Sequence, residues 1–438
     1  MGDEGKGRYA YQLSAEGAYT AIARFNGGAN AGHTFDLDGV EINTHQLPSG
    51  IAHEGRINII GTGSLLDPIA LVEEISELRD KGIDISHDNL RISQGAHLVL
   101  PHHVHMDWIK QNGATKDGST LRGISGAAQS KYGREGFAST PTRLNHDNSR
   151  SVEYIKESLG RTRAISADIE LPEDEAARDS LQRKIAAYTT ENFLEAMVEI
   201  TPYLGNTERE IHRILDTGNN ILAEGAQGYG LDIDHGLRGQ VTSSHTGAGG
   251  ALIGLGLGPG HVRKVYGVAK LVKSRVGGDL DSMPTYVGDE EIETLLRGQP
   301  GMPDYEAGKS TKRLRSMGWF DMPEVKRAIR DNGIDELFVT KLDTIGKTDT
   351  TKVATHYIDD SGAIHDVRPN CIEELRNMKT EYSVPLSTWD EDISDTKHFA
   401  DLPAAARNYL QALEDHLQVP ISLVGVGYRH DQYIDRRH

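Results

Sequence analysis

The stretch 57–83, INIIGTGSLLDPIALVEEISELRDKGI, decides the fold class. Its first seven residues are a short apolar run that ends in a Gly-rich turn, and this pattern predicts a buried strand. The rest predicts an amphipathic helix, because Asp67 is a candidate N-cap, Pro68 takes the first helical position and Gly82 follows the last turn. A strand followed closely by a helix is the building unit of α/β proteins.

The same alternation recurs along the chain. Further helices are predicted over 189–204 and 401–419. Four more apolar runs that end at Gly or polar residues predict strands: NNILAEGAQG (219–228), VYGVAKLV (265–272), LFVTKLD (337–343) and PISLVGVG (420–427). We therefore expect an α/β protein with a large, mostly parallel central sheet flanked by helices, and ligands beyond the carboxyl ends of its strands. No repeat or low-complexity linker interrupts the chain, which favours one large domain over 1–438 with long loop and helical excursions.

Composition excludes several classes of function. No run of 18 apolar residues is present, so the sequence predicts no membrane span, and no signal peptide stands at its start. Cys371 is the single cysteine of the chain, so no intrachain disulfide can form and a cytoplasmic location is expected. A net charge of −18 argues against a nucleic-acid binder.

Two Gly-rich segments near the start are candidate site loops, and the first is a candidate for phosphate binding. In GDEGKG (2–7), glycines surround Lys6, as in loops whose backbone N–H groups approach an anion, but no apolar strand precedes them and a flexible N-terminus is the alternative. In RFNGGANAGHTF (24–35), His33 and Thr34 follow three glycines. The alternative there is a tight loop with an incidental histidine.

Three later segments also concentrate polar chemistry. In 222–250, Asp232, Asp234 and His235 form either a weak metal signal or a polar loop whose side chains bond to the local backbone. The basic run AGKSTKRLRSMGWFD (307–321) stands out in an acidic protein and suits bidentate recognition of carboxylate or phosphate, although a solvated surface loop is the usual interpretation. In FVTKLDT (338–344), Asp343 can accept from the N1–H and 2-amino groups of guanine, or form a buried salt bridge.

In this order, these segments resemble the adenylosuccinate synthetases, the GTP-dependent enzymes that join IMP and aspartate. The resembling segments are GDEGKG, GGANAGHT, HQLPSGI, STLRGISGAA, GREG, EGAQG, LDIDHG, VTSSHT, SRVG, STKRLRSMGWFD, TKLD and VGVGYRHDQ, which run from residue 2 to about residue 432. The resemblance implies a P-loop-NTPase-like fold and ligation through 6-phosphoryl-IMP, the first committed step from IMP to AMP. It also implies Mg²⁺, GTP as co-substrate and a homodimer.

The resemblance assigns roles residue by residue. Asp3 would be the general base that removes the N1 proton of IMP, His33 would stabilise charge on the transferred phosphate, and Lys6 would hold phosphate. The implied IMP-binding residues are Asp3, Asn30, Thr120, Arg134, Gln227, Thr242 and Arg313, with Arg134 reaching the partner's IMP. Those for aspartate are Ser310, Thr311, Arg313 and Arg315. Those for GTP are Glu4, Gly5, Lys6, Gly7, Gly32, His33, Thr34, Lys341, Asp343, Gly425 and Gly427, and Mg²⁺ would contact Asp3 and the carbonyl of Gly32.

The sequence also departs from the family pattern. It starts at the first loop, without the strand that precedes this loop in the family, so we expect exposed edges on the neighbouring strands. The segment usually written TTGRGIGP is STLRGISG, with Leu121 at a glycine position. In the aspartate loop, Ser310 replaces threonine and Lys312 replaces glycine, and Tyr428 stands where proline is expected.

Two other functions fit parts of the pattern. One is the phage-type relative that makes the 2-amino analogue from dGMP, in which the first-loop aspartate is typically a smaller neutral residue; Asp3 favours IMP. The other is a catalytically inactive nucleotide-binding relative. The joint presence of Asp3, Lys6, His33, Arg313 and Asp343 argues against it, because a disused site has no chemical reason to keep them together.

Overall fold

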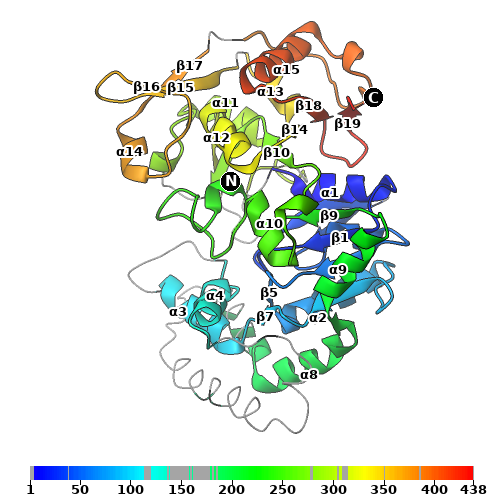
Figure 1. Cartoon of the computed structure of the whole chain (residues 1–438). Helices are drawn as coiled ribbons and strands as arrows, with labels where there is room; N and C mark the ends of the chain where they lie inside the picture. Colours follow the sequence, from blue (N-terminus) through cyan, green and yellow to red (C-terminus); the bar gives the residue numbers. More distant parts are fainter. Residues whose placement is uncertain are drawn as a thin grey trace. The chain divides into compact units, whose positions relative to one another are not determined.

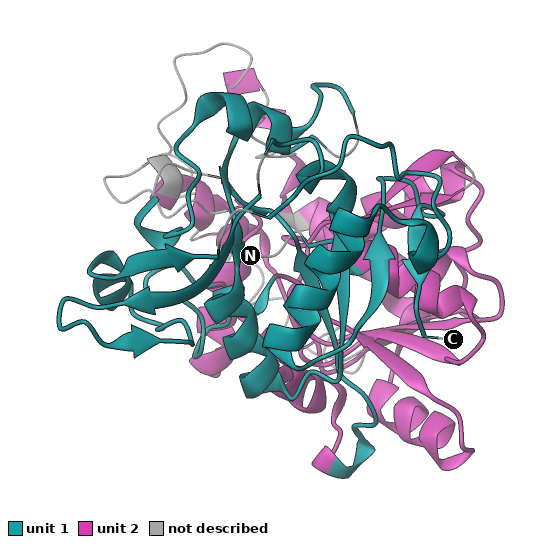
Figure 2. Ribbon diagram, turned by 90° about the horizontal axis from the view of Figure 1, so that it is seen from above, with its two compact units in different colours: residues 1–6, 228–241, 260–438 teal, residues 7–227, 242–259 magenta. Residues whose placement is uncertain are grey.

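The computed structural model describes residues 4–37, 39–112, 120–135, 138, 157, 160, 178–179, 182–183, 186–276, 280–302, 305–307, 314–349, 351–383 and 386–437. Contacts divide the chain into two compact units, shown in Figure 2. Unit 1 comprises residues 1–6, 228–241 and 260–438, and unit 2 comprises 7–227 and 242–259. The single large domain stays a prediction.

Unit 2 is built on a five-stranded parallel sheet with the order β8-β6-β4-β1-β9. The strands are β1 (Ala21–Arg24), β4 (Ile57–Ile60), β6 (Leu90–Ser93), β8 (Leu204–Gly205) and β9 (Ile221–Glu224). Two short pairs lie outside it: β2 (His33–Leu37) with β3 (Val40–Thr44), and β5 (Leu65–Leu66) with β7 (His97–Leu98). The helices of this part of the chain are α1 (Lys6–Ala15), α2 (Pro68–Asp80), α3 (Pro101–Asn112), α4 (Ile124–Tyr132), α8 (Thr190–Ile200), α9 (Thr207–Asp216) and α10 (Ala248–Leu255).

The helix predicted after the strand 57–60 is confirmed as α2. The Asp67 carboxylate accepts a hydrogen bond from the Ala70 N–H at 3.2 Å, and Pro68 is the first helical residue. Leu71, Ile75 and Leu78 are buried in one apolar cluster. In Figure 1, α2 and α8 lie next to each other, and residues of both belong to this cluster.

The other predicted helices are present but shorter than predicted. The segment 189–204 forms α8 with Thr189 as N-cap and ends at Ile200, followed by a 3₁₀ turn at Thr201–Tyr203. Pro202 explains the early end, because it has no backbone N–H to donate to the Val198 carbonyl and its ring would clash with that carbonyl in a continued α-helix. The segment 401–419 forms α15 (Ala404–Leu417), which ends where Gln418 takes a φ of 56°.

Unit 1 contains a four-stranded sheet with the order β10-β14-β18-β19. In it β10 (Tyr266–Lys270), β14 (Glu336–Thr340) and β18 (Ile421–Gly425) are parallel, and β19 (Tyr433–Asp435) is antiparallel. The remaining strands are β11 (Lys273–Val276), β12 (Arg315–Gly318), β13 (Phe320–Asp321), β15 (Val353–Ile358), β16 (Ile364–His365) and β17 (Lys379–Tyr382). The helices are α11 (Glu290–Arg297), α12 (Met322–Asn332), α13 (Leu342–Ile345), α14 (Ile372–Arg376) and α15.

The predicted α/β class is therefore confirmed, with the mostly parallel strands distributed over one main sheet in each unit. The first element that the structure describes is α1, and in the described part of the chain β9 and β10 each end their sheet. Within the described ranges, no helix is long and apolar enough to cross a membrane.

Candidate active site

The first loop contacts the carboxyl end of β14 in unit 1. The Thr340 hydroxyl donates to the carbonyl oxygen of Glu4 at 3.0 Å, and Lys6 Nζ lies 3.1 Å from a Glu4 carboxylate oxygen. Gly5 has a φ of +100°, and an added Cβ would lie 3.2 Å from the Thr340 methyl group. Only glycine meets both conditions without strain. Lys6 opens α1, so its charge stands at a helix N-terminus, where anions bind.

The predicted guanine-binding residues gather at the same sheet edge. Lys341 follows β14 with a φ of 69°, and Asp343 lies in α13 directly after it. Gly425 ends β18, which pairs in parallel with β14. At Gly427 the chain turns so tightly that an added Cβ would lie 2.4 Å from Gln432 Oε1. Unit 1 thus brings together Glu4, Gly5, Lys6, Lys341, Asp343, Gly425 and Gly427.

His33 is buried in unit 2 and is not an incidental loop histidine. It opens β2, and its Nδ1 hydrogen-bonds Glu224 at the carboxyl end of β9. The Glu224 carboxylate also accepts from the Ser49 N–H at 2.8 Å and from the Ser49 hydroxyl at 2.5 Å. Arg24, at the end of β1, places NH1 3.4 Å from His33 Nδ1. These contacts fix the orientation of the imidazole ring.

The electrostatics of this cluster favour an ionised Glu224. Burial raises the pKa of the Glu224 carboxyl, but the charge and hydrogen bond of His33, the charge of Arg24 and the Ser49 hydroxyl outweigh burial and lower it overall. Burial also lowers the pKa of the Arg24 guanidinium, against the opposing effect of Glu224. A buried carboxylate that faces an imidazole stabilises positive charge on the ring. The cluster can therefore support electrostatic catalysis on an anionic substrate.

Gly7 lets α1 approach His33 closely. A Cβ at position 7 would lie 2.5 Å from the His33 Cβ and 2.9 Å from its Cα, so any side chain there would displace β2. Gly32, one residue before His33, is exposed, and an added Cβ would meet nothing within 4 Å. Thr34, one residue after, donates its hydroxyl hydrogen to Asn43 of β3 at 2.5 Å.

Asn26 joins the loops that carry the predicted IMP-binding residues of unit 2. Its amide exchanges hydrogen bonds with the backbone of Ala226 at 2.8 and 3.1 Å and donates to Ser244 at 3.3 Å. Gln227, next to Ala226, has a φ of 60° and packs its amide oxygen against Gly27. Both polar atoms of the Gln227 amide are buried and have no hydrogen-bond partner among the residues described. Unsatisfied buried amides are rare and mark a place where a ligand can bind.

The other IMP-binding candidates of unit 2 lie in loops or flank α4. Asn30 accepts from the Gly28 N–H at 3.1 Å, and Thr242 immediately precedes the Ser243–Ser244 pair. Thr120 and Arg134 are exposed and flank α4. Leu121, at the family's glycine position, has a φ of 60° and packs partly against the core, so this departure places a side chain on left-handed backbone.

A pocket in unit 2 brings α4 and this loop together. It is lined by residues that include Asn26, Ser244, His245, Lys131 and Tyr132. Burial lowers the pKa of the Lys131 ammonium. Sequence reasoning did not select Lys131, because a lysine on a helix surface has no distinguishing pattern.

Arg315, predicted to bind aspartate, contacts a carboxylate of the chain itself. Its NH1 donates to Glu306 at 2.9 Å. The other predicted aspartate-binding residues, Ser310, Thr311 and Arg313, lie outside the described residues, as does Asp3. Sequence reasoning missed Glu306, because a single glutamate before a basic run is typical of a solvated surface. It missed the pairing of Glu224 with His33, because no local pattern links partners 191 residues apart.

The Asp-x-Asp-His segment forms a polar loop. Asp232 is buried, and its carboxylate accepts from the N–H groups of Asp234 and His235 at 3.0 Å each. Among the described residues, no group of three or more His, Cys, Asp or Glu could hold a metal ion.

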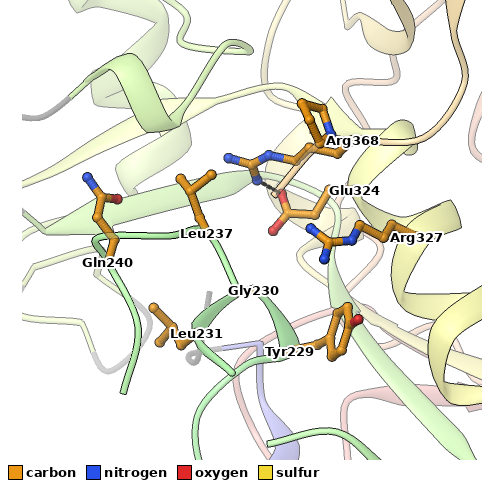
Figure 3. Close-up of a pocket in the computed structure, with 9 residues that line it drawn as sticks. Tyr229, Gly230, Leu231, Leu237, Gln240, Glu324, Arg327 and Arg368 are labelled. Atoms are coloured by element: carbon orange, nitrogen blue, oxygen red, sulfur yellow. Dashed lines mark hydrogen bonds and ion pairs between the residues drawn. The ribbon is translucent and has the colours of Figure 1, made fainter. Parts of the chain in front are cut away.

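The pocket in Figure 3 lies beside this loop in unit 1. Leu231 and Leu237 line it together with Glu324 and Arg327 of α12, and Arg368 donates to Glu324 at 2.6 Å. None of the predicted site residues lines it.

Comparison with known proteins identifies the family. A family model described as Adenylosuccinate synthetase matches residues 1–434. The chain belongs to the adenylosuccinate synthetase family. A relative named adenylosuccinate synthetase from Chlorobium limicola is 36% identical over 447 residues, which cover 100% of this chain and 95% of the relative. One from Caldanaerobacter subterraneus is 36% identical over 439 residues, with coverage of 100% and 97%.

A solved structure agrees with this assignment. Fully ligated adenylosuccinate synthetase from Plasmodium falciparum superimposes with a TM-score of 0.86 at 28% identity and covers 100% of this chain and 97% of that one. The cyanophage S-2L succinoaminodeoxyadenylate synthetase, bound to dGMP and dATP, has a TM-score of 0.56 at 20% identity, which shows a shared fold alone. The chain is a ligase of the adenylosuccinate synthetase type, which joins IMP and L-aspartate, and the phage-type alternative has less support.

Proposed function

We propose that the chain makes adenylosuccinate from IMP and L-aspartate, with GTP as phosphoryl donor and 6-phosphoryl-IMP as intermediate. The observation that carries this proposal beyond family membership is the buried contact between His33 and Glu224, which Ser49 and Arg24 complete. We further propose that the enzyme is one large domain and works in the cytoplasm as a homodimer, with Arg134 of one protomer at the IMP of its partner.

In the first step, Asp3 removes the proton from N1 of IMP. The 6-oxygen then attacks the γ-phosphorus of GTP, a new O–P bond forms, the bond to the β-phosphate oxygen breaks and GDP leaves. Negative charge grows on the phosphate oxygens during this transfer. His33 would stabilise that charge through Nε2, because its Nδ1 is engaged by Glu224. Lys6, together with the backbone at Gly5 and Gly7, would hold the phosphates at the N-terminus of α1.

In the second step, the amino group of aspartate attacks C6 and phosphate leaves. IMP would be held by Asn30, Thr120, Gln227, Thr242 and Arg313. The buried, unpartnered amide of Gln227 supports this assignment, since a bound nucleotide would supply the missing hydrogen bonds. Aspartate would be held by Ser310, Thr311, Arg313 and Arg315, whose guanidinium suits a carboxylate.

Guanine would be read by Lys341 and Asp343. The carboxylate of Asp343 can accept from both N1–H and the 2-amino group, and adenine lacks that pair of donors. Gly425 and Gly427 would place backbone against the base, and Glu4, Gly32 and Thr34 would complete the GTP site. The tight turn at Gly427 supports a backbone surface there.

Magnesium would be held by the Asp3 carboxylate and the Gly32 carbonyl. The donor set fits this ion, because Mg²⁺ binds through one or two carboxylates together with substrate phosphates and water. The open space beside Gly32 is consistent with such an approach. When bound, Mg²⁺ would neutralise charge on the nucleotide phosphates.

An absorbance assay for adenylosuccinate tests the proposal. The purified chain is incubated with IMP, aspartate, GTP and magnesium, and parallel reactions replace IMP by dGMP or GTP by ATP. We expect product with IMP and GTP only. Turnover of dGMP but not of IMP would refute the proposed substrate. Turnover with ATP but not with GTP would refute the proposed guanine site. No turnover in any mixture would favour an inactive relative.

A further inference from the structure

One buried carboxylate in unit 1 contacts cationic side chains from both of the substrate sites proposed there. Glu306 is 4% exposed. Its Oε1 accepts from Lys270 Nζ at 2.9 Å and lies 3.7 Å from Lys341 Nζ. Its Oε2 accepts from Arg315 NH1 and from the Ser274 hydroxyl, each at 2.9 Å. Lys341 is the proposed guanine residue and Arg315 a proposed aspartate residue, so a single carboxylate contacts both.

The sheet topology brings these side chains to one place. Lys270 ends β10 and pairs in register with Thr340, the residue before Lys341, so the two lysines leave the same edge of adjacent parallel strands. Arg315 opens β12, which is antiparallel to β11 with Ser274 opposite Met317. The backbone joins Glu306 to Arg315 as well, because the Arg315 N–H donates to the Glu306 carbonyl at 3.1 Å.

Positive charges gather around Glu306. Three cationic side chains, Lys270, Arg315 and Lys341, face one carboxylate, and each of them is largely buried. Without the negative charge of Glu306 these cations would repel one another in a medium of low dielectric constant. The carboxylate therefore fixes the positions of Arg315 and Lys341 relative to each other.

We propose that Glu306 is a positioning residue that couples the guanine end of the site to the aspartate end. It aims Arg315 at a substrate carboxylate and holds Lys341 at the base, so a change at one contact alters the other. This inference rests on the proposed function, since it uses the roles proposed for Arg315 and Lys341.

The main test is the steady-state kinetics of Glu306→Gln, which keeps the shape of the side chain but removes its charge and one acceptor oxygen. We expect the KM for aspartate to rise about tenfold or more and the KM for GTP to rise about threefold, because a charge-assisted hydrogen bond at Arg315 is lost. The KM for IMP should stay within about twofold. Glu306→Asp, which keeps the charge, should recover part of the aspartate KM.

A matched control is Glu414→Gln. Glu414 is also a largely buried, ion-paired glutamate of unit 1, bonded to Arg436 NH1 at 2.9 Å and NH2 at 3.0 Å and to the Ile421 N–H at 2.7 Å. Glu414→Gln should lower the melting temperature and leave the KM values for aspartate, GTP and IMP unchanged. Equal KM values in folded Glu306→Gln and wild type would mean that Glu306 is only a structural ion pair and would overturn the proposal.

Coupling is tested by a double-mutant cycle with Lys341→Met. In the wild-type background this change should raise the KM for aspartate about threefold as well as the KM for GTP, and in the Glu306→Gln background it should leave the aspartate KM unaltered. If Lys341→Met raised the aspartate KM by the same factor in both backgrounds, coupling would be refuted.

Three further outcomes are informative. If Glu306→Gln does not fold, Ser274→Ala removes one donor to Glu306 without unpairing a charge; a rise of about threefold in the aspartate KM is expected, and no change overturns the proposal. A wild-type chain that forms no adenylosuccinate would refute the proposed function and this inference with it. If the wild type is active and the aspartate KM of the Glu306 and Ser274 variants equals that of the wild type, the inference alone is refuted.

Discussion

Replacing Glu224 by Gln should reduce turnover sharply, because this carboxylate supports positive charge on His33. Arg24 NH1 lies 3.4 Å from His33 Nδ1, and Arg24 is 1% exposed. Two unit charges at that distance repel by about 5 kcal/mol at an effective dielectric constant of about 20. The carboxylate offsets this repulsion, so without it the ring loses about 4 kcal/mol of support for a positive charge, which corresponds to about a thousandfold in kcat.

The assay is kcat for adenylosuccinate formation at saturating substrates, with thermal unfolding measured in parallel. Leaving Arg24 buried without its carboxylate should cost about 3 to 5 kcal/mol of stability, so kinetics are measured well below the melting temperature. Ser49→Ala is the matched control, since it removes one hydroxyl from Glu224 and keeps the charge; its kcat should fall about tenfold or less. A folded Glu224→Gln enzyme with kcat within about threefold of wild type would refute the electrostatic role of His33.

Acid should weaken the same cluster. Because the pKa of Glu224 is lowered in the folded chain from its ordinary value of 4.5, its stabilising effect is complete above that value and is lost as the pH falls through the lower folded value. The melting temperature of the wild type should therefore fall more steeply below about pH 4 than that of Glu224→Gln.

The remaining predictions concern a close approach, a buried acid and the base contact. Gly7→Ala should lower kcat about a hundredfold by displacing His33, whereas Gly249→Ala, in open space on α10, should leave kcat unchanged; steady-state kinetics distinguish them. Burial raises the pKa of Asp67 from 3.8 to about 6, so wild-type unfolding free energy should fall by about 2 kcal/mol between pH 3.8 and 6, and urea titrations of Asp67→Asn should lack this loss. Asp343→Asn should reduce the preference for GTP over ATP at least about tenfold in kcat/KM, and an unchanged ratio would place guanine recognition elsewhere.

Local patterns predicted the elements well where the deciding signals are close in sequence. The N-cap at Asp67, the proline after it and the apolar face of α2 lie within one helix, so the helix was predicted almost to its ends. The predicted end of α8 was wrong by four residues, because the apolar pattern runs past Pro202, which has no N–H to continue the helical hydrogen bonds.

The candidate site was predicted only as a set of segments, since its contacts are long-range. Glu224 follows His33 by 191 residues. The pairing of β1 with β9 in unit 2 places Glu224 opposite Arg24, nine residues before His33. Glu306 gave no signal, because a single glutamate before a basic run is typical of a solvated surface. The resemblance to a family predicted the roles of the site residues, whereas the contacts of His33 with Glu224 and of Arg315 with Glu306 became visible only in the structure.

The division of the chain between the units has a consequence for synthesis on the ribosome. Unit 2 ends at residue 259, whereas most of unit 1 lies in residues 260–438. At about 5 to 20 residues per second, roughly 10 to 40 s pass between the two. During that time unit 2 has all of its chain, while residues 1–6 and 228–241 have emerged without the rest of their unit. These two short segments are thus open to chaperones and proteases during that time, together with the part of 260–438 that has already emerged.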